Sequence, residues 1–279
     1  MLKANLHIHS NCSDGSDSIE VLAKKVSESG LEVVSLTDHD TIDGLEKFES
    51  LLPKNIKFIK GVELTCLAED IKCHLLGYNF NPSDEGLYNL IKKGKNLRRQ
   101  KLDTRIKYLK DVWNIELTKE ESDWLYSRNS VVKTHIANVL VKRGLADDNL
   151  SAMKKYLDNC KTGNTRFDGL EAINVIKNAG GLVVWAHPLG GEGEVHSSKE
   201  EFLKKLDRMV LFGIQGLECF YSRYSNEEIK LLTETAKNYN LYITGGSDYH
   251  GTNKDVPLNR LNIYDEPVDG NQFTILDNF

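Results

Sequence analysis

Histidines alternate with apolar residues near the start of the chain. His7 and His9 flank Ile8 in a stretch whose apolar pattern from residue 4 predicts a β-strand. Side chains alternate between the two faces of a strand, so both imidazoles point to the same face, roughly 7 Å apart along it. Two imidazoles on one face provide half of a four-coordinate metal site. The first strand therefore predicts that further ligands come from elsewhere in the chain.

Further side chains of metal-binding types lie where later apolar stretches begin or end. The full candidate set is His7, His9, Asp14, His39, Glu63, His74, His187, Asp248 and His250. Only His135 and His196 of the eight histidines fall outside it, whereas random placement would scatter histidines through helices as well. Mixed imidazole and carboxylate ligands suit Mn²⁺, Zn²⁺ or Fe²⁺ rather than Ca²⁺. The residue types therefore predict a centre for such divalent metals.

The elements that must position these residues alternate between strands and helices. Apolar strands are expected near residues 4, 32, 56, 74, 182, 214 and 241, and most are followed by a helix that begins at a capping residue. Seven strands interleaved with helices favour an α/β barrel of parallel strands. In such barrels the functional face lies at the carboxyl ends of the strands, where the candidate ligands fall.

One segment interrupts this alternation. Residues 84–113 carry apolar residues at three-, four- and seven-residue spacings and predict one long helix. Its central part, residues 92–110, contains nine Lys or Arg residues and one Asp. Two more helices are expected to begin near Thr118 and Lys133. We predict that residues 84–164 form an all-helical insertion, and that residues 1–83 and 165–279 form the barrel.

The spacing of the candidate residues resembles that of a known family. The motifs are His7-x-His9 with Asp14, Thr37-Asp38-His39-Asp40, Gly61-x-Glu63, His74, Ala186-His187-Pro188 and Gly246-Ser247-Asp248-x-His250. Their order and spacing are similar to those of the polymerase and histidinol phosphatase (PHP) superfamily of metal-dependent phosphoesterases. The helical insertion is similar to the branch containing phosphatases that act on AMP and 3′,5′-bisphosphonucleosides, and 5′-3′ exonucleases that trim short RNA. The resemblance implies a distorted seven-stranded (β/α)7 barrel, with the insertion lying over the active site and selecting the substrate.

The resemblance also implies a trinuclear centre that binds two to three divalent Mn, Zn or Fe ions. In this assignment His7, His9, Glu63 and Asp248 hold one metal, Glu63 bridges to a second that His74 and His187 complete, and Asp14, His39 and His250 hold a third. A hydroxide between two such cations is nucleophilic at neutral pH, and the cations neutralise the phosphoryl oxygens. The expected reaction is hydrolysis of the phosphate of a nucleotide, namely AMP, a 3′,5′-bisphosphonucleoside or a short oligoribonucleotide.

Several basic residues are candidates for contacting the substrate. They are His135 and Lys133 in the insertion, Arg98 and Arg99 on the basic helix, and Arg223 and His196 in the second half of the chain. The family's insertion carries a histidine that faces the site, and His135 matches it. Family members often carry Arg where this chain has Lys133, and lysine lacks the planar fork that binds phosphate through two parallel bonds. His196, beside a glycine-rich loop, is also a candidate donor of the proton that the leaving oxygen needs.

Three other functions remain open. A histidinol-phosphate phosphatase uses the same centre, and only the insertion favours nucleotides over it. A metal-dependent amidohydrolase also places His-x-His on a barrel strand, but it typically bridges its metals with a carboxylated lysine and would leave Asp14, His39 and His250 without a role. A non-catalytic PHP module is expected to have lost ligands, whereas all nine positions are filled here.

The amino-acid composition limits which kinds of molecule the protein is expected to bind. The 279-residue chain has 36 basic and 41 acidic residues, so its net charge of −5 does not favour nucleic acid or membrane through bulk charge. The expected partner is a small phosphate ester, with short single-stranded RNA as an alternative. The five cysteines form no Cys-x-x-Cys pair, and neither a signal peptide nor an apolar run of about 20 residues is present. These features predict a soluble cytoplasmic protein with reduced thiols.

Overall fold

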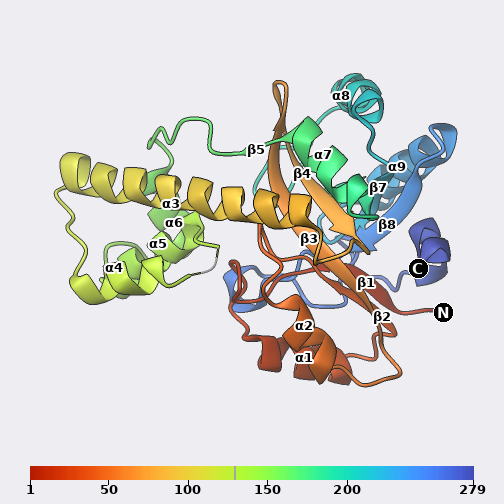
Figure 1. The fold of residues 1–279 in the computed structure, drawn as a ribbon, viewed down its shortest axis with the longest axis horizontal. Coiled ribbons are helices and arrows are strands. Elements are labelled where there is room, and N and C mark those ends of the chain that lie inside the picture. The colour runs from red at the N-terminus through yellow and green to blue at the C-terminus, as the bar shows by residue number, and fades with distance from the viewer. Residues whose placement is uncertain (129) are drawn as a thin grey trace.

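The strands form one sheet that curls into a nearly closed barrel. The computed structural model describes residues 1–128 and 130–279. Seven strands follow one another in the order β1-β2-β3-β4-β6-β7-β8, and the short β5 pairs with β3 beside this path. The strands are β1 (Ala4–Ile8), β2 (Val33–Leu36), β3 (Lys57–Ala68), β4 (Ile71–Tyr78), β5 (Phe167–Asp168), β6 (Leu182–Trp185), β7 (Gly216–Tyr221) and β8 (Tyr242–Gly246). The predicted distorted seven-stranded α/β barrel is confirmed (Figure 1).

The barrel closes between β1 and the segment that follows β8. Ile8 and Tyr249 form a parallel bridge. The His9 N–H donates to the Tyr249 carbonyl at 2.8 Å, and the Asp248 N–H donates to the His7 carbonyl at 2.9 Å. These bonds bring the first and the last of the predicted ligands side by side.

One strand runs against the predicted direction. The β4 strand is antiparallel to both β3 and β6, so the prediction of a wholly parallel barrel was wrong at this position. Only Glu69 and Asp70 separate β3 from β4, and so short a connection allows an antiparallel hairpin but no crossover. Because β4 is reversed, its first half lies at the carboxyl ends of the parallel strands, and His74 pairs opposite Thr65 there.

Helices cover the outside of the barrel and bury its apolar side chains. They are α1 (Ile19–Glu28), α2 (Leu45–Leu51), α7 (Gly169–Asn178), α8 (Lys199–Phe212) and α9 (Asn226–Asn238), followed by the short 3-10 turns η2 (Gly251–Asn253), η3 (Gly270–Gln272) and η4 (Thr274–Asn278). The side chains of Ser18, Asp168, Ser198 and Ser225 cap four of these helices by accepting backbone N–H bonds. No helix in the described parts of the chain combines the length and apolar character of a membrane span.

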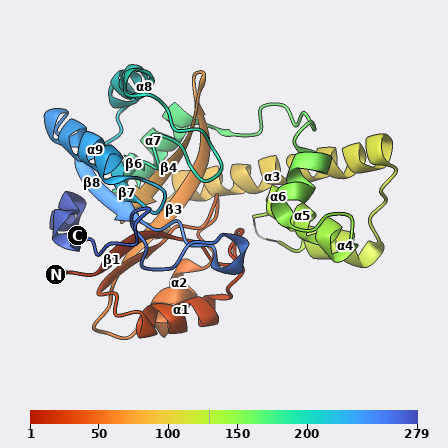
Figure 2. The same cartoon turned by 180° about the vertical axis from the view of Figure 1, so that it is seen from behind.

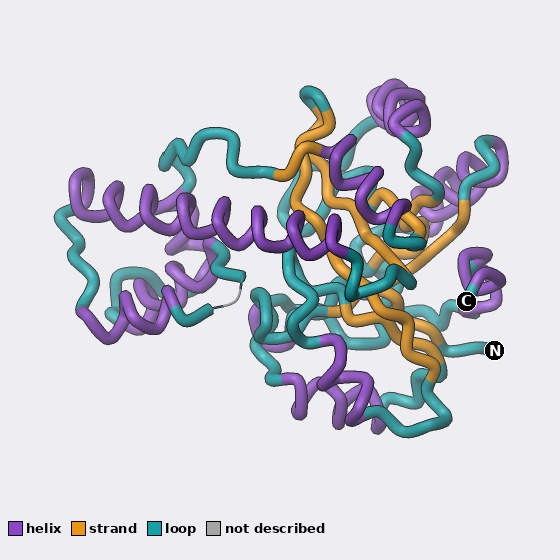
Figure 3. The backbone as a smooth tube through the Cα atoms, in the orientation of Figure 1, coloured by secondary structure: helices purple, strands orange, loops and turns teal. Residues whose placement is uncertain are grey.

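A helical segment projects from the barrel on the side away from the two termini (Figures 1 and 2). It comprises α3 (Glu85–Trp113), α4 (Lys119–Tyr126), α5 (Lys133–Lys142), α6 (Asn149–Ala152) and the π-helical turn η1 (Met153–Leu157). Leu87 and Leu90 of α3 pack into the barrel core, whereas Leu102 and Leu109 of the same helix belong to a second apolar cluster with α4 to η1. Figure 3 shows this part as helices and loops beside the strands of the barrel. The limits 84 and 164, and its part in substrate selection, stay predictions.

Candidate metal centre

The nine predicted ligand residues lie together at the end of the barrel where its parallel strands terminate. His7, Glu63 and His74 lie within β1, β3 and β4, and the other six follow strands. Eight of these residues are buried or nearly so, since no more than 13% of any of their side chains is exposed. His74 is more exposed, at 26% of its side chain. The structure therefore brings every one of these residues into a single site.

The Glu63 carboxylate stands at the middle of the site. Five imidazole nitrogens approach it to between 2.8 and 3.2 Å, and they belong to His7, His9, His39, His74 and His187. Its side chain is only 1% exposed. Together with these imidazoles, the Glu63 carboxylate would hold divalent cations and offset their charge.

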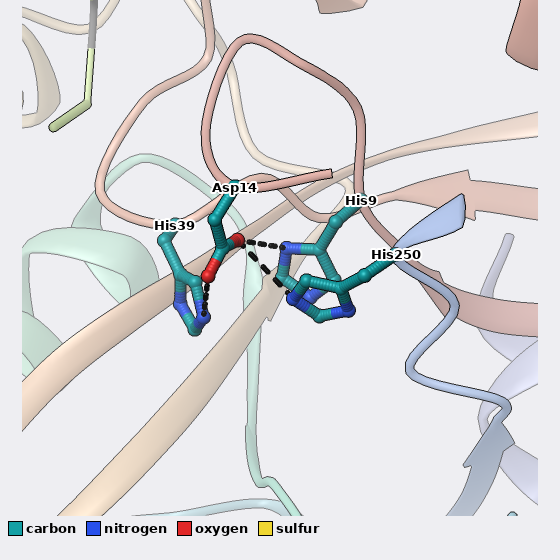
Figure 4. Close-up of side chains that lie close together, drawn as sticks. All are labelled: His9, Asp14, His39 and His250. Atoms are coloured by element: carbon teal, nitrogen blue, oxygen red, sulfur yellow. Dashed lines mark ion pairs between the residues drawn. The ribbon is translucent and has the colours of Figure 1, made fainter. Parts of the chain in front are cut away.

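Asp14 forms a second point of convergence, drawn in Figure 4. Its carboxylate lies 3.1 Å from His250 Nε2 and 3.9 Å from both His9 Nδ1 and His39 Nε2. Asp38 holds the turn that carries Asp14, because its carboxylate accepts bonds from the Ser10 N–H, the Ser10 hydroxyl and the Ser13 hydroxyl. Asp38 is thus part of the support of the turn.

The Asp248 carboxylate lies beside His7 and His9. Its Oδ1 lies 3.6 Å from His7 Nε2 and 3.3 Å from His9 Nε2. Its Oδ2 accepts bonds from the Tyr221 hydroxyl at 3.1 Å and from Lys254 Nζ at 2.7 Å. Asp248 and His187 have φ angles of 57° and 29°, and non-glycine residues adopt such values mainly where function requires it.

The ligand atoms fall into three groups whose members lie within 4.8 Å of one another. The groups are His7, His9, Glu63 and Asp248; His9, Asp14, His39 and His250; and His39, Glu63 and His74. The first group has the same members as the first predicted metal site. His187 Nε2 approaches Glu63 Oε1 to 3.2 Å but belongs to none of the three. The assignment of particular residues to particular metals stays a prediction.

The site contains buried polar atoms that lack a hydrogen-bond partner among the described residues. In the described chain seven ligand atoms are buried without a hydrogen-bond partner: His7 Nε2, His9 Nε2, Asp14 Oδ1, His39 Nδ1, Glu63 Oε2, His74 Nδ1 and His250 Nε2. A buried polar atom without a partner costs roughly 1–3 kcal/mol. Cations among these atoms would satisfy all of them at once, so the residues present fit a polynuclear metal site.

The charges of the site keep its carboxylates ionised. Burial alone would raise the pKa of Glu63, yet the charges of His39 and His7 hold it well below its usual range. Burial would also raise the pKa of Asp14, but the charges of His250 and His39 outweigh burial and hold that pKa well below its usual range. Burial would lower the pKa of His9, but the nearby carboxylates of Asp248 and Glu63 raise it to about 9.

Glu218 supports the site from β7, a strand that carries no predicted ligand. Its side chain is fully buried. Its Oε1 lies 2.8 Å from His7 Nδ1, and its Oε2 accepts the His187 N–H at 2.8 Å. The first contact directs His7 Nε2 to the centre, because a carboxylate partner fixes which imidazole nitrogen carries the proton.

Replacing Glu218 is expected to weaken metal binding without removing a ligand. Glu218→Ala should lower the affinity for Mn²⁺ by about 10- to 100-fold, as loss of such a supporting carboxylate does in other metal sites. Titration calorimetry with Mn²⁺ checks this. Cys219→Ala, the next position of the strand and equally buried, is the matched control and should retain the wild-type affinity. Equal affinity of Glu218→Ala and the wild type would contradict the role.

A cavity opens directly above the centre. Its volume is about 690 Å³. Ligand residues on its floor are His39, Glu63, His74, His187 and Asp248, and its walls include Thr134, Asn149, Glu192, Glu194, His196, Arg223, Asn253 and Lys254. The cavity is large enough for a nucleotide-sized ligand.

The two arginines predicted on α3 have different surroundings. Arg98 is buried, donates from Nε to Asp40 Oδ2 at 2.6 Å, and donates to the Thr65 hydroxyl at 3.0 Å. Arg99 lies over the ring of Tyr126, 5.2 Å from its centroid. Neither lines the cavity in the described chain, so Arg98 fastens α3 to the barrel instead of facing substrate.

Arg98→Leu is expected to destabilise the protein by about 3–5 kcal/mol, because it leaves the Asp40 carboxylate buried without its cation. Both side chains are less than a tenth exposed. Chemical denaturation measures the free energy of unfolding. Arg99→Leu, one position along the same helix, should change it by less than about 1 kcal/mol. A similar small effect for Arg98→Leu would show that the buried pair does not stabilise the fold.

The two candidates on α5 are also engaged within the protein. Lys133 Nζ pairs with Asp158. His135 Nδ1 accepts the Val132 N–H at 3.1 Å, and burial lowers the pKa of His135 to about 4 although the charge of Asp14 acts against it. His135 therefore lies near the Asp14 side of the centre as a neutral imidazole. Its contact with substrate stays a prediction, and its neighbour Thr134 lines the cavity.

The last two candidates, Arg223 and His196, do line the cavity. Arg223 pairs with Glu192, which also lines the cavity. His196 Nδ1 lies 2.5 Å from Glu228 Oε1. Both residues therefore reach the space above the metal centre from the second half of the chain.

Sequence reasoning missed Glu218 and Lys254. A glutamate inside an otherwise apolar strand, residues 216–221, was an available signal for Glu218, since an ionisable group at a buried position needs a partner. The sequence around Lys254 gave no sign of its role, because its contact with Asp248 depends on the turn that brings the two residues together. The charge of Asp248 raises the pKa of Lys254 although burial opposes this, so Lys254 adds a positive charge to the cavity wall.

A β/α barrel that gathers imidazoles and carboxylates at the carboxyl ends of its strands defines a metal-dependent hydrolase of the barrel class. The PHP domain model matches residues 5–168, more than half of the chain. The chain belongs to the PHP family.

Three curated relatives are similar over most of their length. A 5′-3′ exoribonuclease of Haemophilus influenzae is 28% identical, covering 89% of this chain and 90% of its own. The phosphoribosyl 1,2-cyclic phosphate 1,2-diphosphodiesterase of Eggerthella lenta is 28% identical, covering 91% and 96%. A 3′,5′-nucleoside bisphosphate phosphatase of Chromobacterium violaceum is 26% identical, covering 90% and 88%.

A solved structure shares the fold. It is titled an amidohydrolase from Chromobacterium violaceum with bound sulfate and no metal, and it superposes with a TM-score of 0.80 at 24% identity. The superposition covers 91% of this chain and 89% of the other. At this identity the likeness establishes the architecture alone.

Proposed function

We propose that this metal-dependent phosphoester hydrolase acts on nucleotides, removing phosphate from AMP or a 3′,5′-bisphosphonucleoside, with short single-stranded RNA as a further substrate. We further propose that it uses two to three Mn, Zn or Fe ions held by the nine residues of the centre. Relatives named as exoribonuclease and as nucleoside bisphosphate phosphatase support the nucleotide class.

The proposal rests mainly on the residues at the floor of the cavity. Seven buried ligand atoms without partners converge beneath a space of about 690 Å³. When bound there, divalent cations supply an activated water and neutralise the charge of the phosphoryl oxygens. A phosphate ester is the substrate class for which both contributions are needed.

The chain's own residues position the phosphate. Glu63 and Asp248 make the floor anionic, so in the absence of metal ions the floor repels a phosphate group. Lys254 and Arg223 place positive charge on the walls of the cavity. Lys254 Nζ lies 2.7 Å from Asp248 Oδ2. The positively charged side chains of Lys254 and Arg223 orient the phosphate above the centre and displace part of its hydration shell.

The alternative functions have less support. Histidinol phosphate would use the same centre, but none of the three similar relatives described above carries that name. An amidohydrolase centre bridged by lysine does not fit, because Glu63 occupies the middle of this site. A non-catalytic module is disfavoured because all nine ligand residues are present and converge.

A substrate panel tests the proposal. Protein loaded with Mn²⁺ is expected to release phosphate from AMP and adenosine 3′,5′-bisphosphate with a higher kcat/KM than from histidinol phosphate. A 5′-phosphorylated oligoribonucleotide, followed by gel electrophoresis, shows whether chains are also shortened. Glu63→Ala serves as the blank for contaminating phosphatases. A preference for histidinol phosphate would overturn the nucleotide assignment.

A further inference from the structure

The residues after His187 form a loop that is anchored at both ends beside the centre. The Gly190 N–H donates to the His187 carbonyl at 2.9 Å, and the Ser197 N–H donates to the Leu189 carbonyl at 2.7 Å. His196 lies at the end of this loop. Its side chain lines the cavity above the metal centre and also a neighbouring cavity of about 420 Å³ that contains His74 and His187.

The His196 ring is held in one orientation by the start of α9. Its Nδ1 lies 2.5 Å from Glu228 Oε1. Glu228 is itself fixed, because its Oε2 accepts the Ser225 N–H at 2.8 Å in the capping box of the helix. The ring also packs edge-on against Tyr224, with 5.3 Å between the centroids. This arrangement leaves Nε2, on the other side of the ring, as the nitrogen available to a ligand in the cavity.

An imidazole with one nitrogen on a carboxylate and the other towards substrate is suited to moving a proton. The carboxylate sets the tautomer and stabilises the imidazolium form. Other groups on the cavity wall are less suited, since the Arg223 guanidinium does not release its proton and Lys254 is bonded to Asp248. The acidic groups around His196 are Glu228 from α9 and Glu194 from its own loop, and Tyr224 covers one side.

We propose that His196, oriented by Glu228, donates the proton from Nε2 to the leaving oxygen of the phosphate ester. This inference rests on the proposed function. A water oxygen forms the new bond to phosphorus as the bond to the leaving oxygen breaks, and the electron pair of that bond stays on the leaving oxygen. The leaving oxygen takes the His196 proton, and the proton lost by the water returns through solvent to the neutral imidazole.

The test compares two leaving groups in one variant. A nucleoside leaves as a strongly basic alkoxide and needs a proton, whereas p-nitrophenolate is weakly basic and leaves without one. His196→Ala is expected to lower kcat/KM for the best nucleotide substrate on the order of 100- to 1000-fold. Its kcat/KM for p-nitrophenyl phosphate should stay near the wild-type value. Glu228→Gln should show the same selectivity with a smaller loss.

Matched measurements separate this role from others. His196→Gln keeps a polar side chain of similar size and should show the same loss as His196→Ala, while Mn²⁺ affinity by calorimetry stays unchanged in both. Lys199→Ala, on the exposed first turn of α8, is the control. Equal losses of kcat/KM with both leaving groups would indicate that His196 binds the phosphate. Unchanged kcat/KM with both would indicate a structural role. Either result overturns the proposal. Absence of nucleotide hydrolysis by the wild type would refute the proposed function itself.

Discussion

Removal of the divalent cations is expected to reduce hydrolysis of phosphate esters on the order of 10⁴-fold or more, because among the described residues the cavity floor offers no other group that activates water or neutralises phosphate. The floor that remains carries the carboxylates of Glu63 and Asp248, whose charges repel the substrate. Dialysis against a chelator, followed by phosphate-release assays, measures the loss. Addition of Mn²⁺ should restore activity, whereas Ca²⁺ should not, because it prefers oxygen ligands over imidazole.

The same treatment is expected to lower stability. Seven buried polar atoms lose their partners when the cations leave. With free metal at about 1000 times its dissociation constant, binding contributes about 4 kcal/mol to the free energy of unfolding. Thermal and chemical denaturation with and without Mn²⁺ measure the difference. If metal analysis shows that the protein contains no metal and activity nevertheless persists, the metal mechanism is contradicted.

The candidate site could be predicted far better than its surroundings. His7, His9 and Asp248 were recognisable because strand ends and alternating faces are local features of a sequence, and the family motifs fix their order. The direction of β4 was predicted wrongly, although the two residues between β3 and β4 are too few for a parallel crossover. That error did not displace His74, since the start of a reversed strand lies beside the ends of its neighbours.

Partners of charged side chains were the least predictable part. Arg98 and Lys133 are basic residues of the insertion, and their sequence context did not reveal that they pair with Asp40 and Asp158. The partner of Arg98 lies 58 positions away along the chain. The Arg98–Asp40 pair depends on how the insertion packs against the barrel, and the Lys133–Asp158 pair on how the helices of the insertion pack together. Helical periodicity carries no information about either kind of packing. The partners of Glu218 were unpredictable for the same reason, since His7 lies on β1 and His187 follows β6.

Glu63→Ala is expected to abolish catalysis more completely than any other single replacement in the barrel. Five imidazoles approach this one carboxylate, so its loss removes the shared anion from two of the three groups of ligand atoms. We expect a loss of kcat/KM on the order of 10⁴-fold or more. Metal analysis should show at least one ion fewer per chain. Glu69→Ala, an exposed glutamate at the β3–β4 turn, is the matched control.

A double variant distinguishes a shared centre from separate contributions. Asp248 belongs to the same group of ligand atoms as Glu63, and both approach His7 and His9. If the residues act as one unit, the first replacement already dismantles the centre and the second has little left to remove. Glu63→Ala combined with Asp248→Ala should therefore cost about as much in kcat/KM as Glu63→Ala alone. Losses that multiply would instead indicate independent sites, and the carboxylate of Glu63 would not then join them.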